Sequence, residues 1–252
     1  MTYQFTASPD FPPKLLSGWF FLNTWLQHKL NDGVHFEPYD NFKSQHEAIA
    51  QNNIDIIYAN PFDAAMLMRD KGFIPLVKPD QKSDEAVIVV LKDSPIKSID
   101  DIGKTDQIAC TLDPDVYMIS QIMLEAAEID QGKLTTNTCD TYIQVVKSLL
   151  NKQSQLGFFL QEAYDDLSSI AKSQLRVLMV SDIQVIHHVL MISPALVNKQ
   201  QHLSKSLIEM KNIAKDQTIL DALEIKGFVE MEQEEAEMMI DLMDTLNDYP
   251  LP

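Results

Sequence analysis

Hydrophobic and polar positions along the chain alternate between short β-type runs and longer helical stripes. The clearest example is the segment Asp55–Lys78, where closely spaced isoleucines predict a buried strand that stops at Asn60-Pro61. A stretch with apolar positions at helical spacing follows, and then a second extended run at residues 73–77. A strand, a helix and a strand in this order predict a βαβ unit, and therefore a parallel sheet.

The same pattern extends over the rest of the chain. Further strands are predicted at residues 3–7, 34–39, 84–91, 107–110, 135–139, 156–160, 175–180 and 185–193. Further helices are predicted at residues 14–30, 43–51, 113–128, 141–150, 161–169, 203–213, 217–223 and 232–246. Strands that alternate with helices are typical of an α/β fold.

Two places where the chain can cross between sheets divide it into two lobes. These crossings fall near residues 80–90 and 180–190. We therefore expect a discontinuous first lobe of residues 1–83 and 184–252, and a second lobe of residues 84–183, joined by a hinge. A ligand cleft is expected between the lobes, because open α/β sheets bind ligands at the carboxyl ends of their strands.

Composition and charge exclude several classes of function. The chain has 252 residues, and its net charge of -17 argues against binding of nucleic acid and against docking on anionic membranes. The simplest interpretation of this charge is solubility. No apolar run approaches the roughly 20 residues that a membrane span needs, so direct membrane insertion is not expected.

The N-terminal segment leaves the location of the protein open. It has no basic region followed by an apolar stretch, which a secretion signal would require. The protein is periplasmic or otherwise extracytoplasmic if a signal peptide was removed, and cytoplasmic if this N-terminus is native.

Four segments, in this order and spacing, resemble a known family. They are Asp55–Phe62, Ser98–Gly103, Gly157–Tyr164 and Thr218–Phe228. The chain is similar here to the phosphate, phosphite and phosphonate binding proteins of ABC importers. This resemblance implies a type II periplasmic binding protein fold, with two lobes that each contain a mostly parallel sheet flanked by helices.

The resemblance also implies where a ligand binds. In the family, two tyrosines equivalent to Tyr39 and Tyr58 reach the ligand. Residues at the ends of predicted strands complete the expected ligand-binding set: Tyr39, Tyr58, Asn60, Phe62, Thr111, Asp113, Tyr117, Glu162 and His188. A purely structural role for the two tyrosines, in which they only cap strand ends, is the alternative. Under the ligand-binding interpretation, replacing Tyr58 with Ala is expected to weaken binding with little loss of stability.

The segment Asp113–Met118 departs from the family pattern. Phosphonate binders similar to this chain carry a cluster of serine and threonine hydroxyls after the Asp-Pro, at a helix N-terminus where an oxyanion is held. This chain has Asp115, Val116 and Tyr117 there, while Asp113 and Pro114 suit the N-cap and first positions of the helix. We therefore expect an altered anion site that disfavours a tightly held free oxyanion. A neutral, zwitterionic or cationic ligand, or one held through a metal, is then favoured, and Glu162 would strengthen this trend if it faces the cleft.

Histidines and cysteines offer weaker indications. His187 and His188 fall in a predicted strand, so only one of them is expected to face the cleft. The six histidines show no metal-type spacing, and we predict neither a metal site nor a cofactor. Cys110 and Cys139 end strands that we expect to be neighbours; two buried thiols, a disulfide or a soft-ligand site all remain open.

The sequence thus favours a monomeric solute-binding protein that closes on a small molecule. The protein would be the binding component of a phosphonate- or phosphate-type importer. Its partner would be an ABC permease or a membrane sensor. No catalytic residues are predicted, because Gly-rich phosphate loops and the common nucleophile and metal motifs are absent. Two alternatives stay open: an enzyme on the same fold, similar to menaquinone-pathway dehydratases, and a ligand-sensing module of a signalling system.

Overall fold

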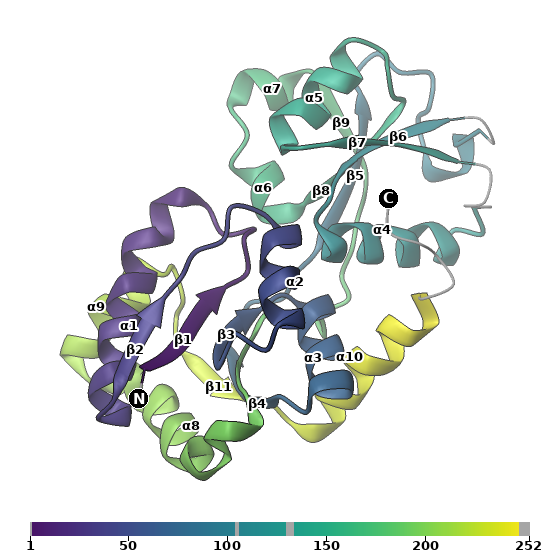
Figure 1. Cartoon of the computed structure of the whole chain (residues 1–252). Helices are drawn as coiled ribbons and strands as arrows, with labels where there is room; N and C mark the ends of the chain where they lie inside the picture. The colour runs from purple at the N-terminus through teal and green to yellow at the C-terminus, as the bar shows by residue number, and fades with distance from the viewer. Residues whose placement is uncertain (1, 104–105, 130–133, 247–252) are drawn as a thin grey trace. The chain divides into compact units, whose positions relative to one another are not determined.

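The computed structural model describes residues 2–103, 106–129 and 134–246, and it divides the chain into two compact units (Figure 1). The first unit consists of Met1–Ser83 and Val185–Thr245, and the second contains Asp84–Gln184. Each unit is a β-sheet with helices on both faces, so the predicted α/β class is confirmed. No helix among the described residues is both long enough and apolar enough to cross a membrane.

The first unit is built on a six-stranded sheet with the order β11-β4-β10-β3-β1-β2. Its strands are β1 (Thr2–Ala7), β2 (Gly33–Phe36), β3 (Ile56–Ala59), β4 (Ile74–Pro79), β10 (Val189–Ile192) and β11 (Phe228–Glu230). Strand β1 pairs in parallel with β2 and with β3, whereas β10 is antiparallel to β3 and to β4. The carboxyl ends of β1, β2 and β3 therefore meet at one edge of the sheet.

Helices cover both faces of this sheet (Figure 1). One face packs against α1 (Leu16–Leu30), α8 (Gln200–Glu209) and α9 (Ala214–Ala222), with Trp19, Leu22 and Leu26 buried. The other face packs against α2 (Phe42–Ala50), α3 (Pro61–Lys71) and α10 (Gln233–Leu246). Short 3-10 turns at Pro13–Leu15, Pro194–Lys199 and Met210–Asn212 lead into or out of these helices.

The second unit is built on a five-stranded sheet with the order β7-β6-β8-β5-β9. Its strands are β5 (Ala86–Leu91), β6 (Gln107–Thr111), β7 (Thr135–Cys139), β8 (Leu156–Leu160) and β9 (Leu175–Val180). Strand β6 is parallel to β7 and β8, while β5 is antiparallel to β8 and β9. The first five residues of β5 are buried, which explains its continuous Ala-Val-Ile-Val-Val run.

Among the residues that the structure describes, four helices and one 3-10 turn surround the second sheet. They are α4 (Pro114–Ala126), α5 (Tyr142–Leu150), α6 (Gln161–Asp165), α7 (Ser169–Ser173) and the turn at Ile99–Asp101. Helix α5 covers a core that includes Val87, Val145 and Phe159. A short loop connects the carboxyl end of β6 to the start of helix α4.

Both sheets are mostly parallel, as expected: four of the six strands in the first sheet and four of the five strands in the second run in one direction. The antiparallel strands are β10 and β11 in the first sheet and β5 in the second. Strands β3 and β4 of the expected βαβ unit do run in the same direction, yet β10 lies between them. This arrangement is a long-range effect, because β10 returns from more than a hundred residues further along the chain and a local pattern cannot indicate it.

Several element boundaries were also wrong. Strand β2 was expected to reach Tyr39 but ends at Phe36, because Pro38 has no backbone N–H with which to continue regular pairing. The helix expected at residues 161–169 is two short helices, and the strand expected at residues 185–193 begins only at Val189. The short edge strand β11 was missed, since three residues carry too little pattern to detect.

Candidate ligand-binding residues in each unit

In the first unit, polar residues gather where β1 and β3 end. Ala7 lies opposite Tyr58 in the parallel register, and the backbone N–H of Ser8 donates to the Tyr58 carbonyl oxygen at 2.8 Å. The two strands therefore bring Ser8 close to Asn60, which follows β3 immediately. This meeting of strand ends is the kind of position at which α/β sheets bind ligands.

Asn60 is completely buried and joins three elements. Its side-chain oxygen caps α3 by accepting from the backbone N–H of Asp63 at 2.7 Å. Its amide nitrogen donates to the Ser8 hydroxyl at 3.1 Å and to the Asp63 carboxylate at 3.0 Å. The side-chain amide is thus fully engaged by the chain itself, and its exposed fraction is 0%.

The buried carboxylate of Asp63 extends this network to α2. Its second oxygen lies 2.7 Å from Nε2 of His46. This hydrogen bond raises the pKa of His46 above its ordinary value, although partial burial opposes the shift. Neither residue was among the predicted site residues, because nothing in the sequence indicates that α2 and α3 lie side by side.

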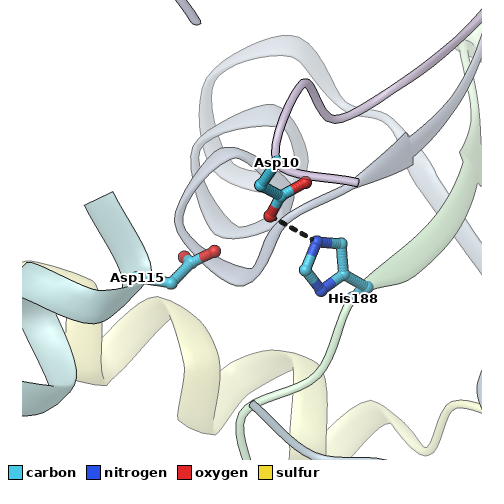
Figure 2. A group of neighbouring side chains, drawn as sticks. All are labelled: Asp10, Asp115 and His188. Atoms are coloured by element: carbon cyan, nitrogen blue, oxygen red, sulfur yellow. Dashed lines mark hydrogen bonds and ion pairs between the residues drawn. The ribbon is translucent and has the colours of Figure 1, made fainter. Parts of the chain in front are cut away.

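His188 pairs with Asp10, as the dashed line in Figure 2 shows. Its Nε2 atom lies 2.9 Å from the Asp10 carboxylate, and its ring stacks on Tyr58 with ring centres 5.1 Å apart. Burial disfavours the charged form of Asp10, but the His188 imidazole and the hydrogen bonds from His188 and Ser8 outweigh it, so the Asp10 pKa lies below its ordinary value. Asp10 was missed, and its only sequence signal is the Ser8-Pro9-Asp10 loop after a strand.

The side chain of Tyr58 is almost completely buried. Its exposed fraction is 7%, and its ring also packs against Trp19 with ring centres 4.8 Å apart. The expectation that its replacement by Ala leaves stability nearly unchanged is therefore wrong, because removing a buried aromatic ring costs about 3–5 kcal/mol. The stacked His188 and Tyr58 rings form the aromatic part of this strand-end cluster.

Tyr39 and Phe62 pack on the opposite face of the first sheet from Tyr58. Both are partly buried against the core that α2 and α3 share with the sheet. Partial burial and the nearby Glu37 raise the pKa of Tyr39 above its ordinary value. Phe62 belongs to the first turn of α3, directly after Asn60-Pro61.

In the second unit, Asp113 caps α4 as the sequence predicted. Its carboxylate accepts from the backbone N–H groups of Asp115 at 3.1 Å and Val116 at 3.5 Å, and Pro114 takes the first helical position. Its other oxygen accepts a hydrogen bond from the Tyr142 hydroxyl at 2.9 Å. The Thr111 hydroxyl accepts from the backbone N–H of Asp113 at 3.4 Å.

Tyr142 was not among the predicted site residues. It is the first residue of α5, directly after the N-cap Thr141, and no sequence signal marks it. Burial, and then the negative charge of Asp113, raise its pKa well above the ordinary value for tyrosine. The hydroxyl therefore keeps its proton and remains a donor to Asp113. Its ring stacks on Phe159 with ring centres 5.5 Å apart, and Tyr164 meets Phe159 edge-on at 6.0 Å.

The remaining predicted residues of the second unit differ in exposure. Asp115, drawn in Figure 2, lies in the first turn of α4 and is 1% exposed. Tyr117 is half-buried on the same helix, and burial raises its pKa. Glu162 is exposed in the first turn of α6.

The two cysteines are buried free thiols on neighbouring strands, as one of the three interpretations held. In the register of β6 and β7, Cys139 lies opposite Thr111, and Cys110 lies opposite Thr138. Since side chains alternate along a strand, the two thiols point to opposite faces of the sheet. Burial raises the pKa of Cys110 to about 12, which keeps it an unreactive thiol.

His187 and His188 have different surroundings, although both precede β10. His187 is buried, with Nδ1 3.1 Å from the Lys82 carbonyl oxygen and Nε2 3.4 Å from the Lys78 ammonium. His188 lies in the strand-end cluster with Asp10 and Tyr58. Strand alternation was the reason to expect only one of the two to face the cleft, but the structure shows irregular backbone at both positions.

Known structures share this fold at low sequence identity. XAC2383 from Xanthomonas citri, in a structure bound to chloride, matches with a TM-score of 0.83 and 13% identity, covering 99% of both chains. PhnD1 from Prochlorococcus marinus, in complex with methylphosphonate, has a TM-score of 0.79 and 14% identity over 98% of both chains. The aliphatic sulphonate binding protein SsuA from Escherichia coli has a TM-score of 0.72 and 11% identity, covering 98% of this chain and 87% of its own.

These matches confirm the predicted type II periplasmic binding protein fold. A search of curated proteins found no match to the sequence. A family model described as "ABC transporter, phosphonate, periplasmic substrate-binding protein" covers residues 5–236. The chain therefore belongs to the family of periplasmic substrate-binding proteins of phosphonate ABC transporters.

Proposed function

We propose that this chain is the solute-binding component of an ABC importer and that its two units close on a small molecule. The observation that carries the proposal is the family match over residues 5–236, which spans both units. In such a protein, ligand contacts to both units stabilise the closed form, and binding shifts the population towards it.

Each unit contributes residues from strand ends to the proposed site. The first unit contributes Tyr39, Tyr58, Phe62 and His188, and the second contributes Thr111, Asp113, Tyr117 and Glu162. Asn60 is buried and fully hydrogen-bonded, so its proposed role is to position Ser8 and the start of α3. In the first unit, His188 is hydrogen-bonded to Asp10 and stacked on Tyr58, which supports a preformed wall with little reorganisation on binding.

Membership of a transport family favours binding without turnover, an ABC permease as partner and a location outside the cytoplasm. We therefore propose a monomeric, extracytoplasmic binding protein that has no catalytic residues. Chemical change of a bound molecule would contradict this part of the proposal.

Native mass spectrometry provides the test. The protein is stripped of bound molecules by unfolding and refolding, and is then incubated with a small-molecule extract of cells. We expect one adduct of discrete mass per chain, unchanged after prolonged incubation. Absence of any adduct would contradict a solute-binding function, and a time-dependent change in the adduct's mass would favour an enzyme.

A pair of tyrosine variants localises the adduct. Tyr39→Ala removes a partly buried ring after β2, whereas Tyr3→Ala removes a partly buried ring at the opposite end of the sheet. We expect the first variant to lower adduct abundance by roughly tenfold or more and the second to leave it unchanged. Equal loss in both variants would remove Tyr39 from the proposed site.

A further inference from the structure

The backbone donors at the start of α4 are already occupied by the protein. A helix N-terminus binds oxyanions through its free N–H groups. Here the N–H groups of Asp115 and Val116 donate to the Asp113 carboxylate, whose other oxygen accepts from Tyr142. An incoming phosphonate would compete with a buried carboxylate of the same charge for the same donors, and it would face the nearby Asp115.

The helices that follow β2, β3 and β7 also have side-chain N-caps, whereas α6 after β8 and the 3-10 turn after β1 have none among the described residues. Asn60 accepts from the N–H of Asp63 at the start of α3, and Thr141 accepts from the N–H of Gln144 at the start of α5. These helix starts offer an oxyanion fewer free donors than an uncapped helix would.

The loops after the parallel strands also lack basic residues. No Lys or Arg occurs in the segments that directly follow β1, β2, β3, β6, β7 and β8, and each segment carries at least one acid: residues 8–12, 37–41, 60–64, 112–116, 140–144 and 161–165. Lys14 and Lys43 lie in the first helical turns after β1 and β2, and Lys14 pairs with Glu224. Lys78 and Lys82 belong to β4 and the turn after it, and Lys78 pairs with Glu235. The imidazoles of His46 and His188 are bonded to Asp63 and Asp10.

Aromatic rings stand beside the Asp113 carboxylate. Tyr142 donates to Asp113 and stacks on Phe159, and Tyr164 meets the same phenylalanine edge-on. Tyr142 and Tyr164 are both partly exposed, and the Lys172 ammonium already lies 5.7 Å from the centre of the Tyr164 ring. Aromatic faces next to a carboxylate favour ammonium groups over oxyanions.

We infer that the ligand carries a positively charged group, an amine or a quaternary ammonium, and that Asp115 determines this specificity. The inference rests on the proposed solute-binding function and defines its substrate class. Asp115 occupies a position where hydroxyls would bind a phosphonate, and its carboxylate turns the start of α4 from an anion site into a site for cations.

Calorimetric titration with two small probes of opposite charge tests the inference. Tetramethylammonium and methylphosphonate are similar in size, so charge is the main difference between them. We expect the wild-type protein to bind tetramethylammonium at least roughly tenfold more tightly than methylphosphonate. Tighter binding of methylphosphonate, or binding of neither probe, overturns the inference.

The variant Asp115→Ser replaces the carboxylate with a hydroxyl and is expected to reverse the preference. Asp93→Ser makes the same charge change at an exposed turn after β5 and serves as the control, with the wild-type preference retained. Because Asp115 is buried, the urea midpoint of each variant is measured first, and Asp115→Asn replaces Asp115→Ser if the latter unfolds. An unchanged preference in the folded variant contradicts the role of Asp115.

This experiment separates the two proposals. If native mass spectrometry detects an adduct but the wild-type protein prefers methylphosphonate, the solute-binding function stands and the cationic substrate class fails. If no adduct forms with any extract, the solute-binding function itself fails.

Discussion

Helices α3 and α4 start with the same local device in the two units. Each follows a strand end, each has an Asx residue as N-cap, and each has proline at its first position. Asn60 caps α3 with a neutral amide that also donates to Ser8 and Asp63. Asp113 caps α4 with a carboxylate that accepts from two backbone N–H groups and from Tyr142.

The difference between an amide and a carboxylate gives the two caps different functions. The amide both donates and accepts, so it links β1, α3 and, through Asp63, α2 into one rigid corner. The carboxylate only accepts, so it brings a negative charge to the start of its helix. The first cap serves architecture, whereas we propose that the second keeps the backbone donors at the start of α4 from an incoming oxyanion.

Among changes to the two caps and their hydrogen-bond partners, the largest expected effect is the loss of stability in Asn60→Ala. This change removes the cap of α3 and leaves buried groups of Ser8 and Asp63 without their amide partner, at a cost of roughly 2–4 kcal/mol. Urea unfolding measures it. Asn41→Ala, at the exposed cap of α2, is the matched control and is expected to cost about 0.5–2 kcal/mol. Equal losses at the two caps would show that the Asn60 network adds nothing beyond capping.

Tyr142→Phe is expected to have the next largest effect. It removes the hydroxyl that donates to Asp113 while it keeps the ring, and we expect a loss of about 1–2 kcal/mol in the free energy of unfolding. Tyr164→Phe is the control, because its hydroxyl has no hydrogen bond among the described residues. A Tyr142→Phe variant as stable as the control would mean that Asp113 draws no support from this hydroxyl.

Replacing Asp113 separates capping from charge. Both replacements remove the acceptor of the Tyr142 hydroxyl, so they are compared in the Tyr142→Phe background. There, Asp113→Ser keeps a good N-cap and is expected to change stability by less than about 0.5 kcal/mol, whereas Asp113→Ala is expected to cost about 1 kcal/mol. Thermal unfolding followed by circular dichroism distinguishes them. If the serine variant is as unstable as the alanine variant, the charge of Asp113 and not its capping geometry stabilises α4.

The smallest expected effect is a pH dependence of the stability that the His46–Asp63 hydrogen bond contributes. The pKa of His46 is raised in the folded protein by its hydrogen bond to Asp63, so its contribution to stability is complete below the unfolded value of 6.5 and disappears as the pH rises through the folded value. The stability difference between wild type and His46→Gln should therefore shrink from pH 6 to pH 8. A difference that grows with pH contradicts the His46–Asp63 assignment. The imidazole is 39% exposed, so solvent screening keeps this effect small.

Local chemistry in the sequence predicted the caps and most elements. The Asn60-Pro61 and Asp113-Pro114 pairs indicated helix starts, and both are confirmed. Buried strands such as β5 and β8 were predicted because their apolar runs are short, rich in branched or aromatic residues and bounded by polar segments.

Partners that are distant in sequence were not predictable. Asp10 lies 178 residues from His188, and Tyr142 lies 29 residues from Asp113. The insertion of β10 between β3 and β4 has the same cause, because sheet order depends on the whole fold and not on any single segment. The family resemblance located the strand ends, but only coordinates showed which polar side chains meet there.

The most direct test of the account is to identify the molecule that the protein retains. After native mass spectrometry isolates the complex, tandem mass spectrometry of the released molecule determines its composition and charge. The account predicts one molecule per chain that carries an amine or a quaternary ammonium group and no phosphonate. A released phosphonate or phosphate would contradict the central claim that the start of α4 rejects oxyanions.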